Sequence, residues 1–371
     1  MYKFYRDTIL PRLFFPIFFI HFLLIKIYSI LNLKKNVNKK TSLILSAGSR
    51  GWESIEFKEL YSSACEYLGF DQVYKHSVID TTKYYEDVKR TLKNEKCTHF
   101  MYDPRTGNQE LIKGTWDAIK ISYLLVRHNI TPIVLSTDLS IRSWRIRSSF
   151  VSVISGIVIC FVSPQKIHSI FPHHRLYGPF LMPLSLNTFN TLSFLKKPTN
   201  TSHKKHAIFI GSLYEPRTTM LNQIKDGLIQ KGFDLDIRGR VLGGPRKPDS
   251  EYWATMVNAD IIFTTADQIS LPEIDWSWVQ NLVYRYVEVL ASGSLLIAPE
   301  VPGVDKYFKA GTHFVSFNNI EDAIEKISYY LENQVERDKI ADEGNKIAKS
   351  LIESRIFWTL IDSSLSYKSL K

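Results

Sequence analysis

Residues 284–299 read Tyr-Arg-Tyr-Val-Glu-Val-Leu-Ala-Ser-Gly-Ser-Leu-Leu-Ile-Ala-Pro, and this pattern is the strongest indication of the fold class. Its first part predicts a short helix that carries Arg285 and Glu288 on one face, three residues apart. Gly293 suits the left-handed position at which many helices end, and an apolar strand follows at once. A helix that turns directly into a buried strand is typical of a parallel sheet covered by helices.

The same alternation extends in both directions along the chain. Strands are expected at Ser42–Ser46, Thr98–Tyr102, Pro132–Ser136, Gly156–Val162, Phe180–Pro183, Ala207–Ile210, Asp234–Ile237, Ile261–Thr264, Leu295–Ala298 and Phe314–Phe317. Helices are expected between them at Glu56–Leu68, Lys83–Asn94, Gly114–His128, Thr218–Lys231, Val283–Ala291, Ile320–Asn333 and Glu336–Ile352. This order predicts an α/β chain with two doubly wound, Rossmann-like domains that face a cleft, with ligands at the carboxyl ends of the strands.

A polar, basic stretch at residues 196–206 reads as the linker between the two domains. The expected organisation is therefore a hydrophobic basic segment at 1–40, an acceptor domain at 41–195 and a donor domain at 207–352. Residues 353–371 form a tail or helix that is expected to cross back to the first domain.

The N-terminal segment carries most of the net charge. The chain nets +10, and residues 1–40 hold eight basic residues against Asp7, which gives +7. This distribution favours an anionic lipid surface over nucleic acid. Within the segment, Leu13–Leu33 is apolar and just long enough to span a bilayer, but it is interrupted by Pro16, His21 and Lys26.

Three placements of this segment are open: a spanning helix, a monotopic helix in the membrane interface, and a helix packed on the soluble domain. Basic residues are slightly more numerous after the segment than before it, which predicts a globular body on the cytoplasmic side of the membrane. The three cysteines are widely spaced and fit a reducing compartment.

Glycines follow the first strand of each half. Gly48 and Gly51 stand in a turn that is expected to line the acceptor side, although an ordinary strand–helix turn would look the same. In the second half Gly211 precedes Arg217, and Arg240 ends a later strand. Two basic loops at strand ends of one sheet suit a diphosphate, because arginine matches phosphate oxygens with a planar fork.

Residues 205–350 as a set resemble the C-terminal half of GT-B glycosyltransferases, especially the spore-maturation-type branch related to family 4. The matching pieces are Gly211 to Arg217, then Glu288 to Gly293, then the glycine-led strand at 311–315 and finally Arg337 to Gly344. The resemblance implies a nucleotide-sugar substrate, no other cofactor and no bound metal, with arginines and helix dipoles neutralising the diphosphate.

Carried over residue by residue, Glu288 matches the glutamate that accepts hydrogen bonds from the donor ribose, and Arg285 the arginine three positions earlier. Gly211 and Arg217 match the turn beside the donor phosphates. A second family glutamate, eight positions before the first, is Gln280 here. The alternative for Glu288 is a structural ion pair with Arg285.

Asp103 and Asp138 each follow an expected strand of the first domain, and either carboxylate is a candidate catalytic base. Both equally suit helix capping. Asp234 and Asp236 form an Asp-x-Asp pair, but they are expected at a strand start, the wrong end of the sheet for a metal site.

The predicted function is transfer of a sugar from a nucleotide-sugar donor to a glycan or lipid-linked acceptor at the cytoplasmic membrane face. Two alternatives remain: a non-catalytic donor-binding or scaffolding subunit of surface-polysaccharide assembly, and a nucleotide-sugar epimerase of the same architecture.

Overall fold

The computed structural model describes residues 10–31, 42–94, 97–136, 141–154, 157–161, 176–195, 207–241, 244–266 and 280–366. The chain divides into two compact units. The first unit contains the described residues up to Phe180 together with those from Trp358 onward, and the second is Leu181–Phe357.

In the first unit the described strands form a parallel sheet in the order β2-β1-β3-β4-β5-β6. The strands are β1 Leu43–Gly48, β2 Val73–Val78, β3 His99–Tyr102, β4 Thr131–Ser136, β5 Ile157–Cys160 and β6 Leu176–Tyr177. Because β2 and β3 lie on opposite sides of β1, the order reverses between β1 and β3, where open α/β sheets bind ligands.

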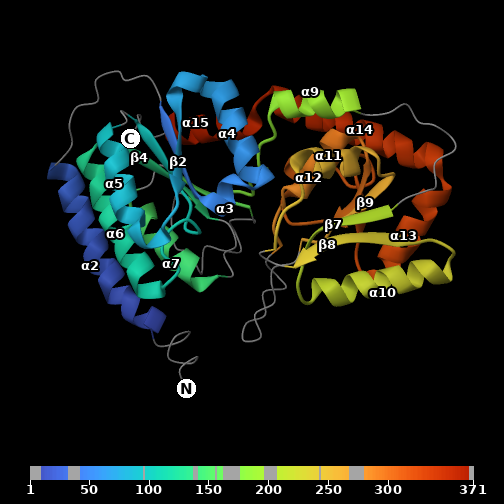
Figure 1. The fold of residues 1–371 in the computed structure, drawn as a ribbon, viewed down its shortest axis with the longest axis horizontal. Coiled ribbons are helices and arrows are strands. Elements are labelled where there is room, and N and C mark those ends of the chain that lie inside the picture. The colour runs from blue at the N-terminus through green and yellow to red at the C-terminus, as the bar shows by residue number, and fades with distance from the viewer. Residues whose placement is uncertain are drawn as a thin grey trace. The chain divides into compact units, whose positions relative to one another are not determined.

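The helices of the first unit connect and cover these strands. They are α2 Leu10–Leu31, α3 Ser49–Trp52, α4 Ile55–Leu68, α5 Tyr84–Asn94, α6 Leu111–Arg127, α7 Arg142–Ser152 and α15 Ile356–Ser366. Helix α2 lies against α6 and α7 (Figure 1). The C-terminal segment packs against α4. Trp358 is buried there, and its Nε1 donates to the Ser63 hydroxyl at 3.1 Å.

In the second unit the described strands form a parallel sheet in the order β11-β10-β9-β7-β8. The strands are β7 Ala207–Leu213, β8 Leu235–Val241, β9 Ile261–Phe263, β10 Leu295–Pro299 and β11 Val315–Phe317. The helices are α9 Leu186–Leu195, α10 Arg217–Gln230, α11 Asp249–Val257, α12 Arg285–Ser292, α13 Ile320–Glu332 and α14 Gln334–Glu353. Here the strand order reverses between β7 and β9.

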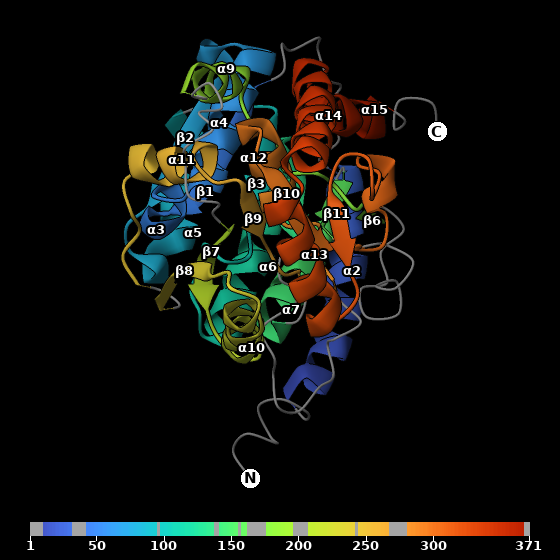
Figure 2. The same ribbon diagram turned by 90° about the vertical axis from the view of Figure 1, so that its right-hand side faces the viewer.

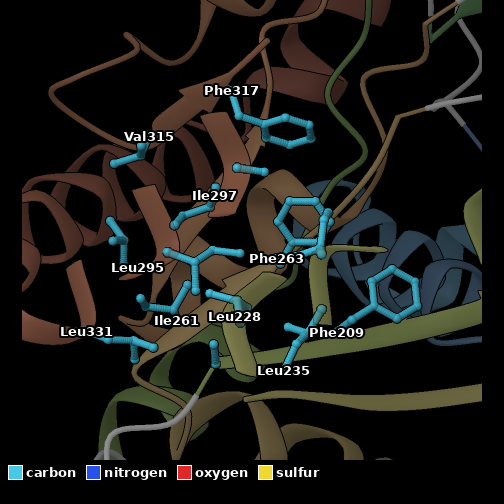
Figure 3. Close-up of a cluster of buried hydrophobic side chains, with 14 of the residues drawn as sticks. Phe209, Leu228, Leu235, Ile261, Phe263, Leu295, Ile297, Val315, Phe317 and Leu331 are labelled. Atoms are coloured by element: carbon cyan, nitrogen blue, oxygen red, sulfur yellow. The ribbon is translucent and has the colours of Figure 1, made fainter. Parts of the chain in front are cut away.

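The buried core of the second unit explains the regular alternation of apolar strands and helices in its sequence. Phe209, Phe263 and Phe317 come from three strands and pack with Leu228 of α10 and Leu331 of α13 (Figure 3). Helix α14 packs beside α13 and completes the helical layer over this core (Figure 2). Burial of this apolar surface, at about 25 cal/mol per Å², is the main favourable term for the unit.

Three details differ from the sequence-based expectation. Phe180–Pro183 is buried without being a strand, because an apolar run reports burial and does not by itself specify a strand. Strand β2 was not expected; it lies at the edge of its sheet and alternates exposed and buried residues. Residues 186–195, which the expected boundary placed in the first domain, form helix α9, which belongs to the second unit and packs on α11, α12 and α14.

Among the helical residues that the structure describes, no helix is both long and apolar enough to cross a membrane. The apolar N-terminal segment is helical over Leu10–Leu31.

Candidate functional site

Arg217 lies at the reversal point of the second sheet, as the first residue of α10. Its Nε donates to Thr265 Oγ1 at 2.7 Å, and its Nη1 donates to the Ser212 carbonyl at 3.0 Å. The guanidinium also lies over the Tyr214 ring, 4.2 Å from the centroid. These contacts come from the ends of β7 and β9, so the cation is fixed where a ligand of this fold binds.

The prediction for Gly211 needs a correction. Strand β7 continues to Leu213, so Gly211 lies within the strand, paired with Gly239 of β8, and not in the turn. A Cβ at Gly211 would come within 3.0 Å of the Phe209 ring. The glycine therefore serves packing, and residues 214–216 make the turn into α10.

Arg240 lies near the carboxyl end of β8, paired in register with Ser212. Its Nη1 donates to the Gly244 carbonyl at 2.8 Å. Burial, and secondarily the nearby Arg246, lowers the pKa of Arg240 from its ordinary value. A second cation therefore occupies the same end of the sheet as Arg217.

The Asp-x-Asp pair lies at the start of β8, as expected, and each carboxylate has a basic partner. Asp234 is 3.2 Å from Lys225 Nζ, and Asp236 accepts from Arg238 Nε at 2.7 Å. Both contacts suit a structural role for the pair.

Glu288 is buried on α12 between two partners. Its Oε1 accepts from the Tyr252 hydroxyl at 2.7 Å, and its Oε2 lies 3.1 Å from Arg285 Nη1. Arg285 also donates to the Tyr252 hydroxyl and, from Nη2, to the Ile210 carbonyl of β7 at 2.9 Å. Desolvation raises the pKa of Tyr252 well above its usual value, which keeps its proton available to Glu288.

Glu288 and Arg285 therefore form the structural ion pair that was the alternative reading of Glu288. The pair lies in the interior of the second unit and is not exposed on the helix surface. Arg285 ties the pair to β7, the strand that leads to Arg217. The ribose contact stays a prediction, and it requires a ribose hydroxyl to join or replace the Tyr252 donor.

A cavity of about 410 Å³ lies at the carboxyl ends of β10 and β11. Gln280 lines it, at the position where the family resemblance places a sugar-contacting glutamate. Met220, which lies about one turn after Arg217 in α10, also lines the cavity. Its polar lining comes from Gln280, Glu300, Asn318, Asn319 and Glu321.

In the first unit Asp103 does lie at the carboxyl end of its strand, but its carboxylate is engaged. It is buried, and both oxygens accept from Arg105, through Nε at 3.1 and 3.0 Å and through Nη2 at 2.8 Å. Its Oδ1 also accepts from the Arg105 amide at 2.8 Å. A carboxylate whose two oxygens are both occupied by Arg105 suits turn formation better than proton transfer. Asp138 lies outside the described residues.

Gly48 ends β1 beside the reversal point of the first sheet, and Gly51 lies in the short helix α3. A Cβ at Gly51 would approach Ala47 Cβ to 3.0 Å, so the glycine allows α3 to pack on β1. The acceptor-side role of these two glycines stays a prediction.

Three side chains of the site were not predicted from the sequence: Thr265, Tyr214 and Tyr252. Thr265 follows an expected strand directly, so the rule that ligand-facing residues follow strand ends would have found it. Tyr214 stands in the quoted turn beside Arg217. No sequence pattern around Tyr252 indicates a site residue, because its contacts with Arg285 and Glu288 depend on how α11 packs in the fold.

Two comparisons with known proteins bear on this site. Residues 217–353 match a family described as glycosyl transferase-like. The match begins at Arg217 and includes Arg240, Arg285 and Glu288. No curated protein sequence matches the chain significantly.

The fold is similar to several solved structures. Anabaena Alr3699/HepE in complex with UDP and glucose has a TM-score of 0.57 at 11% identity, over 86% of this chain and 99% of that one. A glycosyltransferase from Rickettsia africae gives 0.56 at 10% identity, over 88% and 98%. Sucrose-phosphate synthase from Thermosynechococcus elongatus gives 0.54 at 11% identity, over 89% and 98%. The two parallel-sheet α/β units therefore match the fold of GT-B glycosyltransferases, and the second unit carries a glycosyl transferase-like domain.

Proposed function

We propose that the protein is a glycosyltransferase that moves a sugar from a nucleotide-sugar donor to a glycan or lipid-linked acceptor at the cytoplasmic face of a membrane. The observation that carries the proposal is the fixed position of Arg217 at the reversal point of the second sheet, between Thr265 and Ser212. The family match over 217–353 and the UDP-bound structural neighbours support it. Arg285 three positions before Glu288 supports the spore-maturation-type branch.

In this proposal Arg217 and Arg240 bind the donor diphosphate and stabilise the negative charge that develops as the sugar leaves. The two arginines and the first-turn amides of α10 supply this stabilisation without a bound metal. Binding both substrates converts an encounter in solution into a reaction between oriented groups.

We assign the transferred sugar to the cavity beside Gln280. Amide and carboxylate groups line it, and these groups bind neutral hydroxyls well. Replacing Gln280 by Ala should lower kcat more than it weakens binding of the nucleoside diphosphate alone. Equal effects on both quantities would place the sugar elsewhere.

A non-catalytic, donor-binding subunit is the second candidate. It is favoured by the engaged carboxylate of Asp103 and by Gln280 in place of the family glutamate. Purified full-length protein incubated with a panel of nucleotide sugars separates the two candidates. Slow donor hydrolysis that disappears in Arg217→Ala supports the enzyme, whereas tight donor binding without any turnover supports the subunit.

A further inference from the structure

One face of helix α2 is fixed to the first unit along most of its described length. The His21 ring nitrogen Nε2 lies 3.2 Å from the Phe150 carbonyl of α7, and Ile25 is fully buried. Phe18 packs edge-on against Phe150, and Tyr28 against Tyr123 of α6. Residues 18, 21, 25 and 28 recur at helical spacing, so they form one continuous inward stripe.

The opposite face of α2 is apolar and exposed. Among its described side chains, nine large apolar ones between Ile17 and Leu31 are exposed. Ile20, Leu24 and Leu31 are 56%, 53% and 78% exposed. This reverses the usual pattern of a surface helix, which turns its polar face outward. An apolar patch of this kind marks an interaction surface.

Charge decides which partner fits this face. Helix α2 contains no acidic residue, and its exposed Lys26 lies near the Phe22 ring, with Nζ 5.8 Å from the centroid. The first 40 residues carry eight basic residues against one acidic residue. A second copy of the chain would bring two such segments together and repel, whereas an anionic bilayer attracts both the charge and the apolar face.

We propose that α2 is a monotopic membrane anchor, lying in the plane of an anionic bilayer with its outward face in the lipid and its inward face on α6 and α7. A helix that crossed the bilayer would lose the contacts of His21, Ile25 and Tyr28 with the first unit. The outward face of α2 is then the surface through which the protein contacts the membrane named in the proposed function. This role of α2 does not depend on the proposed reaction.

The first test is co-sedimentation of the full chain with vesicles. Phosphatidylcholine vesicles with and without phosphatidylglycerol are compared for the wild type and for the triple variant Ile20→Glu, Leu24→Glu, Ile27→Glu. The matched control is Phe70→Glu, Ile79→Glu, Phe194→Glu, which changes three exposed apolar residues on other elements. We expect the α2 variant to bind anionic vesicles roughly tenfold or more weakly and the control to bind like the wild type.

Equal melting temperatures for the three proteins show that all are folded. Wild-type binding by the α2 variant would overturn the proposal. So would vesicle-independent dimerisation of the wild type that the α2 variant abolishes, because that result makes a second copy the partner.

The second test measures depth in the bilayer and separates a monotopic from a spanning helix. Ile17, Leu24 and Leu31 are replaced one at a time by Cys and labelled with a fluorophore; the three native cysteines are buried. Seven residues correspond to about 10 Å of helix. Lipids with nitroxides at defined depths should quench all three labels equally and at a shallow depth. Quenching that is deepest at Leu24, or that changes steadily along the helix, would overturn the monotopic placement.

Discussion

Glu288 shows how one buried side chain serves structure and, by the proposal, ligand binding. Its two oxygens contact different groups, the Tyr252 hydroxyl and Arg285. Removing the charge leaves Arg285 buried beside a neutral amide, which costs about 1.5–3 kcal/mol. A ribose that binds here would use the same two oxygens, so stability and ligand discrimination can be measured on the same variants.

We therefore expect Glu288→Gln to lower the melting temperature and also to remove discrimination between ribo- and 2′-deoxyribonucleotides. Tyr252→Phe is the matched control, because it removes the 2.7 Å hydrogen bond and leaves the carboxylate in place. That variant should lose stability and keep its discrimination. If Glu288→Gln discriminates like the wild type, Glu288 has a structural role alone.

His76 predicts a dependence of stability on pH. It is buried beneath α5, and its Nδ1 lies 2.8 Å from the Ser46 hydroxyl. Its Nε2 has no hydrogen-bond partner among the residues that the structure describes. Desolvation lowers the pKa of His76, and the more distant Asp87 only partly opposes this. Below about pH 6.5 the unfolded chain therefore binds a proton that the folded chain does not.

The contribution of His76 to stability is complete above about pH 6.5 and is lost on acidification, by at most about 1.4 kcal/mol per pH unit. His76→Asn, which keeps a polar atom near Ser46, should show a shallower loss of unfolding free energy between pH 7 and 5. Urea denaturation at several pH values measures this. Parallel curves for variant and wild type would mean that His76 does not titrate between the two states.

At the scale of elements, the packing of helix α14 gives a physical reason for the glycine that ends the Arg337 to Gly344 pattern. Helix α14 approaches α12 and the loop before β11 so closely that a Cβ at Gly344 would lie 2.4 Å from the His313 carbonyl oxygen and 2.7 Å from Leu290. Arg337, about two turns earlier in the same helix, is buried and pairs with Asp260 at 3.1 Å.

Gly344→Ala should destabilise the second unit by about 1–3 kcal/mol, because the backbone oxygen cannot move aside without shifting α14. Ser350→Ala changes an exposed position of the same helix and should leave stability unchanged. Chemical denaturation of both variants checks this. An unchanged midpoint for Gly344→Ala would show that the helices can separate freely.

Element types were largely predictable, because apolar periodicity follows from burial and most strands here are buried along their length. Strand β2 could not be found in this way, because the polar residues Lys75, His76 and Ser77 break up its apolar residues. The positions of Arg217 and Arg285 followed from the motifs, but their partners Thr265 and Tyr252 are 48 and 33 residues away in sequence. Such contacts depend on strand order and helix packing, which local sequence does not specify.

At the scale of the whole molecule, the chain leaves the first unit after Phe180 and returns to it at Trp358. Trp358 is 3% exposed and stacks on Tyr67, with ring centroids 6.4 Å apart. Trp358 lies within the tail expected at residues 353–371, and the return of the whole tail to the first domain stays a prediction.

Trp358→Ala should destabilise the first unit by about 3–5 kcal/mol, because it removes a large buried ring and the donor to Ser63. Trp358→Phe keeps most of the packing and should cost less. Hydrogen exchange should accelerate in β1 and β3 and stay unchanged in β7 to β10. Acceleration limited to the last helix would contradict a role of Trp358 in holding the unit together.

The central claim, that the second unit binds the diphosphate of a nucleotide sugar at Arg217, is tested most directly by titration calorimetry with a panel of nucleoside diphosphates and their nucleosides. The full chain should bind at least one diphosphate, and Arg217→Ala should weaken that binding roughly ten- to a hundredfold, since a charge-assisted hydrogen bond contributes about 1.5–3 kcal/mol. Binding of the matching nucleoside should stay unchanged. The absence of binding to every diphosphate, or an equal loss for diphosphate and nucleoside, would contradict the claim.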